Sequence, residues 1–221
     1  MQINVIPMAP VWSISKKVVR EHGINVFLTS AKVNSPTTQF TTIERRKELV
    51  GVALKDDVAI VEDDCFGSAQ YFGVSYRALY PENGWYVASF SKSIAPSLRI
   101  GCAICPKGMA DALRHIIFSA SLGISSAQVY VANFVLRHSK LAEIQKMVRD
   151  ELRVYVAETV KLLDQFDISW KPDVPMIWLT LPGRWHTTAF CSAAEKLGVL
   201  VSPGEFLSSE SPAPRMLCAY V

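Results

Sequence analysis

The chain has 221 residues, of which 50% are hydrophobic and 19% are charged, and its formal net charge is +3. This length is enough for one large domain, or for one domain with a smaller companion. The small net charge gives no argument for a nucleic-acid partner, and no apolar run reaches the roughly 18–20 residues of a membrane span. Five cysteines, with no basic and apolar leader ahead of them, predict reduced thiols and a cytoplasmic location.

The first part of the chain alternates short apolar runs with helical patterns. Strands are predicted at residues 3–6, 24–29, 58–61, 85–88 and 100–104, and helices at 13–22 and 43–53. Thr42 stands at the N-cap of the second helix, where its hydroxyl can accept a backbone hydrogen bond. The basic run 45–47 on that helix is expected to form a solvated face. Strands and helices in alternation predict an α/β fold with a mostly parallel sheet and flanking helices.

The second part of the chain is helical before its character changes. Helices are predicted at residues 125–137, 141–166 and 187–197, strands at 176–181, at 200–201 and from 214, and a turn at 203–204. We therefore expect a large domain over residues 1–139. A long linking helix and a small α+β C-terminal domain should follow over residues 140–221.

Polar residues follow two of the predicted strands directly. The acidic run 62–64 comes after strand 58–61, and the segment 89–101, which contains Lys92, comes after strand 85–88. In open α/β sheets, ligands bind at the carboxyl ends of the strands. The sequence therefore places a candidate site at this edge of the sheet.

Lys92 and its neighbours have two interpretations. Burial disfavours the charged form of a lysine, and a lysine with a lowered pKa is what Schiff-base chemistry requires. The alternative is a solvated Ser/Lys loop. Asp63 could be the ion-pair partner of Lys92, or could hold a proton on the heterocyclic nitrogen of pyridoxal phosphate. Arg99 could bind a phosphate dianion through a bidentate contact. No nucleotide P-loop motif is present.

Four segments resemble those of the fold-type I pyridoxal-phosphate enzymes of aminotransferase class I/II. The nearer likeness is to the branch that contains 2-aminoadipate aminotransferases and the aminotransferase-like domains of MocR regulators. The segments are Val-Glu-Asp-Asp (61–64), Ser-Phe-Ser-Lys (89–92) with Leu-Arg-Ile-Gly (98–101), Thr-Thr-Ile-Glu-Arg-Arg (41–46), and 199–204 with Arg215. The resemblance runs nearly end to end and implies a partial large domain of the PLP-transferase fold.

The resemblance implies a role for each matching residue. Lys92 would form the Schiff base with pyridoxal 5'-phosphate and move a proton on the substrate, and Asp63 would keep the pyridine nitrogen protonated. Ser89 and Arg99 would bind the cofactor phosphate. Arg215 would bind the α-carboxylate of the substrate, the alternative being an exposed strand arginine.

Two departures from the family pattern affect the cofactor site. Cys65 and Phe66 stand where the family usually has a tyrosine, so one hydrogen bond to the cofactor is expected to be missing, at a loss of roughly 1.5–3 kcal/mol. In the family's Asn-Pro-Thr-Gly loop, Ser35 takes the place of the asparagine and Thr38 that of the glycine. Asn34, one residue earlier, is kept as a candidate cofactor residue.

The resemblance implies an aminotransferase that moves an amino group between an amino acid and a 2-oxo acid. The alternatives are a cofactor-binding sensor domain of a MocR-type transcriptional regulator and a catalytically inert product. The chain is expected to be truncated at both ends relative to the family, whose members are homodimers. Nucleic-acid binding is expected only with a further DNA-binding domain. No metal is expected, since Cys102 and Cys105 would face opposite sides of a strand.

Overall fold

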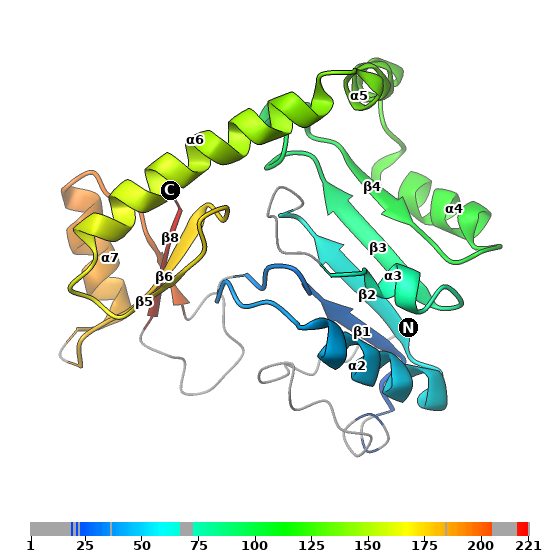
Figure 1. Cartoon of the computed structure of the whole chain (residues 1–221), viewed down its shortest axis with the longest axis horizontal. Coiled ribbons are helices and arrows are strands. Elements are labelled where there is room, and N and C mark those ends of the chain that lie inside the picture. The colour runs from blue at the N-terminus through cyan, green and yellow to red at the C-terminus, as the bar shows by residue number, and fades with distance from the viewer. Residues whose placement is uncertain are drawn as a thin grey trace. The chain divides into compact units, whose positions relative to one another are not determined.

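The computed structural model describes residues 19, 21, 23–35, 37–66, 73–183, 185–204 and 216–220, the last range by its backbone alone (Figure 1). The predicted strand at 3–6 and most of the predicted helix at 13–22 lie outside these residues. The chain divides into two compact units. The large unit contains Lys16–Asn34 and Phe40–Glu151, and the small unit contains Met1–Ser15, Ser35–Gln39 and Leu152–Val221. The domain boundary expected at residues 139 and 140 stays a prediction.

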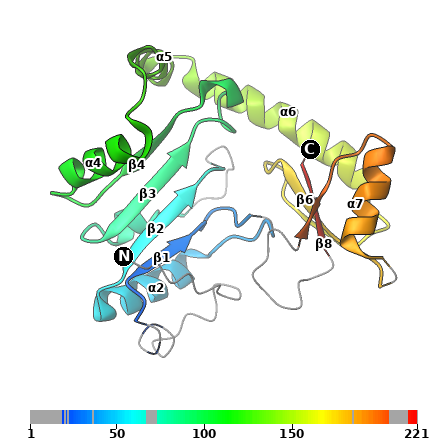
Figure 2. The ribbon, with the colours of Figure 1, turned by 180° about the vertical axis from the view of Figure 1, so that it is seen from behind.

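The large unit is built on a sheet with the strand order β1-β2-β3-β4. Its strands are β1 (Val26–Thr29), β2 (Ala59–Asp64), β3 (Gly84–Ser89) and β4 (Gly101–Ile104). The first three strands are parallel, and β4 is antiparallel to β3. Helices α2 (Ile43–Asp56) and α3 (Tyr76–Leu79) lie on the same face of the sheet in both views (Figures 1 and 2). The predicted α/β fold with a mostly parallel sheet is confirmed.

Helix α2 begins where the sequence predicts. The Thr42 hydroxyl accepts a hydrogen bond from the backbone N–H of Arg45 at 3.3 Å. The helix ends at Asp57, which has a left-handed backbone conformation (φ 51°). The prediction that the run 45–47 is a solvated face is wrong for Arg46, whose exposed fraction is 1%. Its guanidinium donates to the carbonyls of Thr41, Val74 and Ala31, at 2.9, 3.1 and 3.1 Å.

Strand β2 extends through the acidic run, so the prediction that the acids follow the strand is wrong. Its residues alternate in burial: Ile60, Glu62 and Asp64 are buried, whereas Val61 and Asp63 are half-buried. Glu62 accepts a hydrogen bond from the N–H of Tyr76 at 2.7 Å and lies 3.9 Å from the Arg46 guanidinium. Because buried carboxylates are tolerated when they are paired, the strand can continue through these acids.

Three helices follow the sheet: α4 (Ala110–Ser121), α5 (Ser126–Arg137) and α6 (Leu141–Leu162). The Ser125 hydroxyl caps α5 by accepting from the N–H of Gln128 at 3.2 Å. Helix α6 runs from the large unit into the small unit. It ends before the predicted position 166, because a turn, closed by a 2.9 Å bond from the Phe166 N–H to the Leu163 carbonyl, leads into the next strand.

The small unit contains an antiparallel sheet with the strand order β5-β6-β8-β7. Its elements are β5 (Ile168–Trp170), β6 (Met176–Thr180), α7 (Thr187–Lys196), β7 (Ser202–Pro203) and β8 (Met216–Tyr220). Residues 176–179 of β6 are buried, and Phe190 packs against Leu179 and Leu181. The strand predicted at 200–201 lies two residues later, where Ser202 pairs with Cys218, and Leu200 is 78% exposed.

Replacing Arg46 with alanine should lower the free energy of unfolding by about 3–5 kcal/mol, because Glu62 would remain buried without its cation. Arg45→Ala is the matched control. The ion pair of Arg45 with Glu48 is partly exposed, and its loss should cost at most about 1 kcal/mol. Urea unfolding of both variants measures the difference, and equal losses would contradict the structural role of Arg46.

Candidate functional site

The candidate site lies at the carboxyl ends of β2 and β3, two parallel strands that are side by side in both views (Figures 1 and 2). Asp63 is paired in register with Val87 of β3. The turn that carries Lys92 begins directly after β3. It is closed by hydrogen bonds from the Ile94 N–H to the Phe90 carbonyl (3.0 Å) and from the Phe90 N–H to the Ile100 carbonyl (3.1 Å). Asp63 and Lys92 therefore lie at the same edge of the sheet, as predicted from the sequence.

Residues 65 and 66 connect Asp63 with Lys92. The Cys65 Sγ lies 2.8 Å from the Asp63 Oδ1 and donates a hydrogen bond to it. The Lys92 Nζ lies 3.6 Å from the centroid of the Phe66 ring, which is the geometry of a cation–π contact. Phe66 is buried and, as a phenylalanine, offers no hydroxyl. The positive charge of Lys92 also acts on the Cys65 thiol, so the four side chains form one cluster.

The three acids of β2 have different partners. Asp64 binds the Lys32 ammonium and accepts from the Tyr86 hydroxyl, and Glu62 has the partners described above. Burial raises the pKa of Glu62 and, together with the hydrogen bond to Asp64, the pKa of Tyr86. Asp63 alternates to the opposite face of the strand. In the part of the chain that the structure describes, its hydrogen bond comes from a thiol rather than from a cation. Of the three carboxylates, Asp63 therefore differs in its face of the strand and in its neutral donor.

Ser89 and Arg99 flank the Lys92 turn. Ser89 ends β3 and is paired in register with Gly101, and its Oγ accepts from the N–H of Ser91 at 3.2 Å. Arg99 is exposed and has a positive φ of 47°, an uncommon conformation for a residue with a side chain. A Cβ at Gly101 would lie 2.6 Å from the Ala88 carbonyl oxygen. The glycine therefore allows β4 to approach β3, which places Ser89 opposite the start of β4, two residues after Arg99.

The remaining two residues predicted from the sequence are Asn34 and Arg215. Asn34 is half-buried in the loop that follows β1. The last residue of β1, Thr29, is paired with Glu62, so this loop leaves the sheet at the edge that carries Asp63. Arg215 lies outside the described residues.

Sequence reasoning missed three contacts of this region. The contact of Cys65 with Asp63 had a local signal, since residues two apart at a strand end point the same way. The contact of Lys32 with Asp64 joins residues 32 positions apart, and no pattern in the sequence indicates it. The contact of Phe66 with Lys92 depends on how the turn after β3 folds back, which the sequence does not specify.

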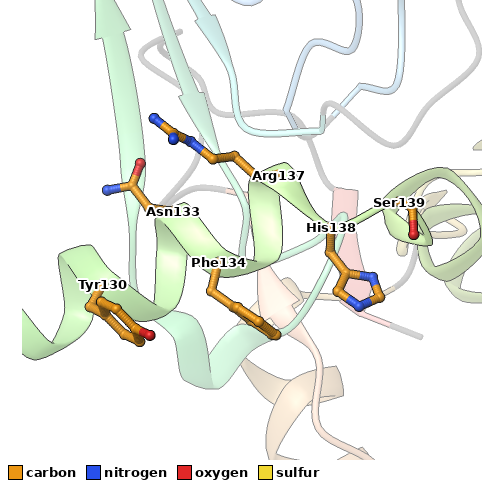
Figure 3. Close-up of a pocket in the computed structure, with 6 residues that line it drawn as sticks. All are labelled: Tyr130, Asn133, Phe134, Arg137, His138 and Ser139. Atoms are coloured by element: carbon orange, nitrogen blue, oxygen red, sulfur yellow. The ribbon is translucent and has the colours of Figure 1, made fainter.

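A hollow of about 480 Å³ lies along the C-terminal half of α5 (Figure 3). It is lined by Tyr130, Asn133, Phe134, Arg137, His138 and Ser139. The rings of Phe134 and His138 lie 5.6 Å apart. The lining contains none of the residues that the sequence analysis selected.

The described residues contain neither a metal-binding cluster nor a membrane-spanning helix. Within the described ranges, no three His, Cys, Asp or Glu side chains are grouped so that they could hold a metal ion. Of the helices in those ranges, none is both long and apolar enough to cross a membrane.

Comparison with known proteins gives two kinds of sequence relative. No family model matches the chain. The chain is 26% identical over 202 residues to an uncharacterized HTH-type transcriptional regulator, YisV, of Bacillus subtilis, covering 86% of this chain and 41% of the relative. It is 27% identical over 198 residues to aromatic-amino-acid aminotransferase 1 of Thermococcus litoralis, covering 82% of this chain and 46% of the relative. The chain spans about half the length of the curated relatives it matches.

Two of the similar solved structures are aminotransferases. The kynurenine aminotransferase of Pyrococcus horikoshii, in complex with PMP, matches with a TM-score of 0.80 and 22% identity, over 92% of this chain and 53% of that chain. LysN, the alpha-aminoadipate aminotransferase of Thermus thermophilus, matches with a TM-score of 0.81 and 18% identity, over 92% and 56%. The chain therefore has the fold of the fold-type I pyridoxal-phosphate-dependent aminotransferases, and it spans about half of such a chain.

Proposed function

We propose that this chain is the cofactor-binding part of a pyridoxal-phosphate-dependent aminotransferase, which moves an amino group between an amino acid and a 2-oxo acid. The observation that carries the proposal is the position of Lys92 beside Asp63, at neighbouring parallel strand ends. The shared fold supports it, because the Pyrococcus and Thermus enzymes were solved with PMP and with a phosphopyridoxyl amino acid.

The residues of the site fit pyridoxal 5'-phosphate by their chemistry. When bound, this cofactor supplies an aldehyde that links to amines and a protonated ring that withdraws electrons from the substrate Cα. Asp63 is suited to hold the proton on the ring nitrogen, since its hydrogen bond within the described residues comes from the neutral Cys65 thiol. Ser89 offers a hydroxyl and Arg99 a planar guanidinium for the phosphate dianion. Asn34 is a further candidate from the loop after β1.

Lys92 has two tasks under this proposal. Its neutral amine links to the cofactor, and it later moves a proton at the substrate Cα. The Phe66 ring stabilises the charged ammonium through the cation–π contact, and the amine must leave this contact before it can react. The substrate must therefore bind where the Lys92 amine can leave the ring. Arg215 is proposed, from the family resemblance, to bind the substrate carboxylate.

A second candidate function is a sensor domain of a MocR-type transcriptional regulator. It is favoured by the regulators among the sequence relatives, which include YisV and the Escherichia coli regulator YjiR, at 24% identity over 228 residues. In such a protein the same site would bind an amine without releasing a 2-oxo acid, and DNA binding would need a further domain. A homodimer and a cytoplasmic location are proposed for either function.

Turnover tests the proposed function. Purified protein with pyridoxal phosphate should convert an amino acid and 2-oxoglutarate into the corresponding 2-oxo acid and glutamate, and Lys92→Ala should lower kcat by roughly 10²–10⁴-fold or more. Lys107→Ala, at an exposed lysine, is the matched control and should keep the activity of the unaltered chain.

The outcomes separate the two candidate functions. Cofactor binding with a spectral change on adding an amino acid, but without 2-oxo acid release, would favour the sensor. Equal activity of Lys92→Ala and the unaltered chain would contradict the proposed role of Lys92.

Replacing Phe66 with tyrosine should strengthen cofactor binding. The new hydroxyl would restore a hydrogen bond worth roughly 1.5–3 kcal/mol, which corresponds to about a 10- to 150-fold lower Kd. Phe118→Tyr, at a ring that is 60% exposed on α4, controls for the added hydroxyl. Absorbance titration with pyridoxal phosphate measures both, and an unchanged or higher Kd for Phe66→Tyr would show that position 66 does not face the cofactor.

A further inference from the structure

Cys65 lies in the Lys92 region, at one of the two positions where the family usually has a tyrosine. Its Sγ donates to the Asp63 Oδ1 across 2.8 Å. Glu62 and Asp64, on either side of Asp63 in the sequence, point to the opposite face and have their own partners. The thiol is therefore directed at the one carboxylate of β2 that faces away from α2 and α3.

A thiol is an unusual hydrogen-bond donor to a carboxylate, and it carries no charge. A lysine or arginine in its place would orient Asp63 but would also cancel its charge. A neutral S–H donor fixes the carboxylate and leaves the negative charge available to a cationic nitrogen of a ligand. A carboxylate held in one orientation also loses less conformational entropy when that ligand binds.

The thiol keeps its proton in this environment. Burial, followed by the hydrogen bond to Asp63 and the charge of Asp63, raises the pKa of Cys65 to about 11, with Asp64 acting in the same direction and Lys92 against it. Below that value the side chain is a donor and not a thiolate. The Cys65 side chain therefore stays a hydrogen-bond donor at neutral pH.

We infer that Cys65 is a positioning residue, whose thiol holds the Asp63 carboxylate toward the ring nitrogen of the bound cofactor. The inference rests on the proposed function, because that function supplies the ring nitrogen. It adds a residue that acts through Asp63 and does not itself touch the reacting atoms.

The first test uses the chain with pyridoxal phosphate bound. Cys65→Ala should raise the Kd of the cofactor about two- to tenfold, as expected for the loss of one hydrogen bond from a weak thiol donor. It should also lower the pH at which the ring nitrogen loses its proton, followed by ¹⁵N NMR of labelled cofactor. Cys65→Ser keeps a donor and should restore both values toward those of the unaltered chain. Cys102→Ala, at an exposed cysteine of β4, should change neither.

The second test needs no cofactor. In the cofactor-free chain, Asp63→Asn removes the charge that helps to raise the pKa of Cys65, so that pKa should fall. Since the thiolate is the reactive form, iodoacetamide should alkylate Cys65 at pH 8 at least about threefold faster in this variant, with Cys102 as the internal reference. Peptide mass spectrometry follows both cysteines.

The outcomes separate this inference from the proposed function. If the unaltered chain does not bind pyridoxal phosphate, the proposed function fails and the inference fails with it. If the cofactor binds but Cys65→Ala retains the affinity and the ring-nitrogen signal of the unaltered chain, the inference alone is wrong. A Cys65→Ser variant that behaves like Cys65→Ala, or an alkylation rate that Asp63→Asn leaves unchanged, would also overturn it.

Discussion

The pairing of two buried carboxylates on β2 determines how the large unit presents its site. Glu62 is held by the Arg46 guanidinium and the Tyr76 N–H, and Asp64 by Lys32 and the Tyr86 hydroxyl. Without these partners two carboxylates could not be buried against the helices, since an unpaired buried charge is strongly unfavourable. With them, the strand continues to Asp64, and alternation turns Asp63 to the opposite face.

The position of Lys92 follows from β3, because its turn begins directly after that strand and the register of β3 is set by its pairing with β2. Asp63 is opposite Val87 of the parallel strand β3, and that strand ends two residues later at Ser89. The turn after Ser89 returns to β4, which can approach closely because residue 101 is a glycine. A lysine amine, a carboxylate, a hydroxyl and a guanidinium thus come from three short segments of one sheet. Asp63 and Ser89 lie on strands, which hold functional groups more precisely than loops do.

Much of this arrangement could be predicted from the sequence, because it depends on local patterns. Apolar runs followed by polar residues located the strand ends that carry Asp63 and Lys92, and the Thr42 cap located the start of α2. The sequence failed where distant side chains decide the outcome. Arg46 belongs to a basic run that is typical of a solvated helix face. In the structure, however, three carbonyl groups and Glu62 surround its guanidinium. Because Glu62 and Asp64 find such distant partners, β2 includes acidic residues that a sequence pattern would place after the end of a strand.

The central claim is that the edge of the sheet between Asp63 and Lys92 binds pyridoxal phosphate through the amine of Lys92. The most direct measurement is borohydride reduction of the protein with pyridoxal phosphate, followed by peptide mass spectrometry. The account predicts one phosphopyridoxyl group per chain, on the peptide that contains Lys92. A label distributed over the exposed lysines, or one retained in full by Lys92→Ala, would contradict it.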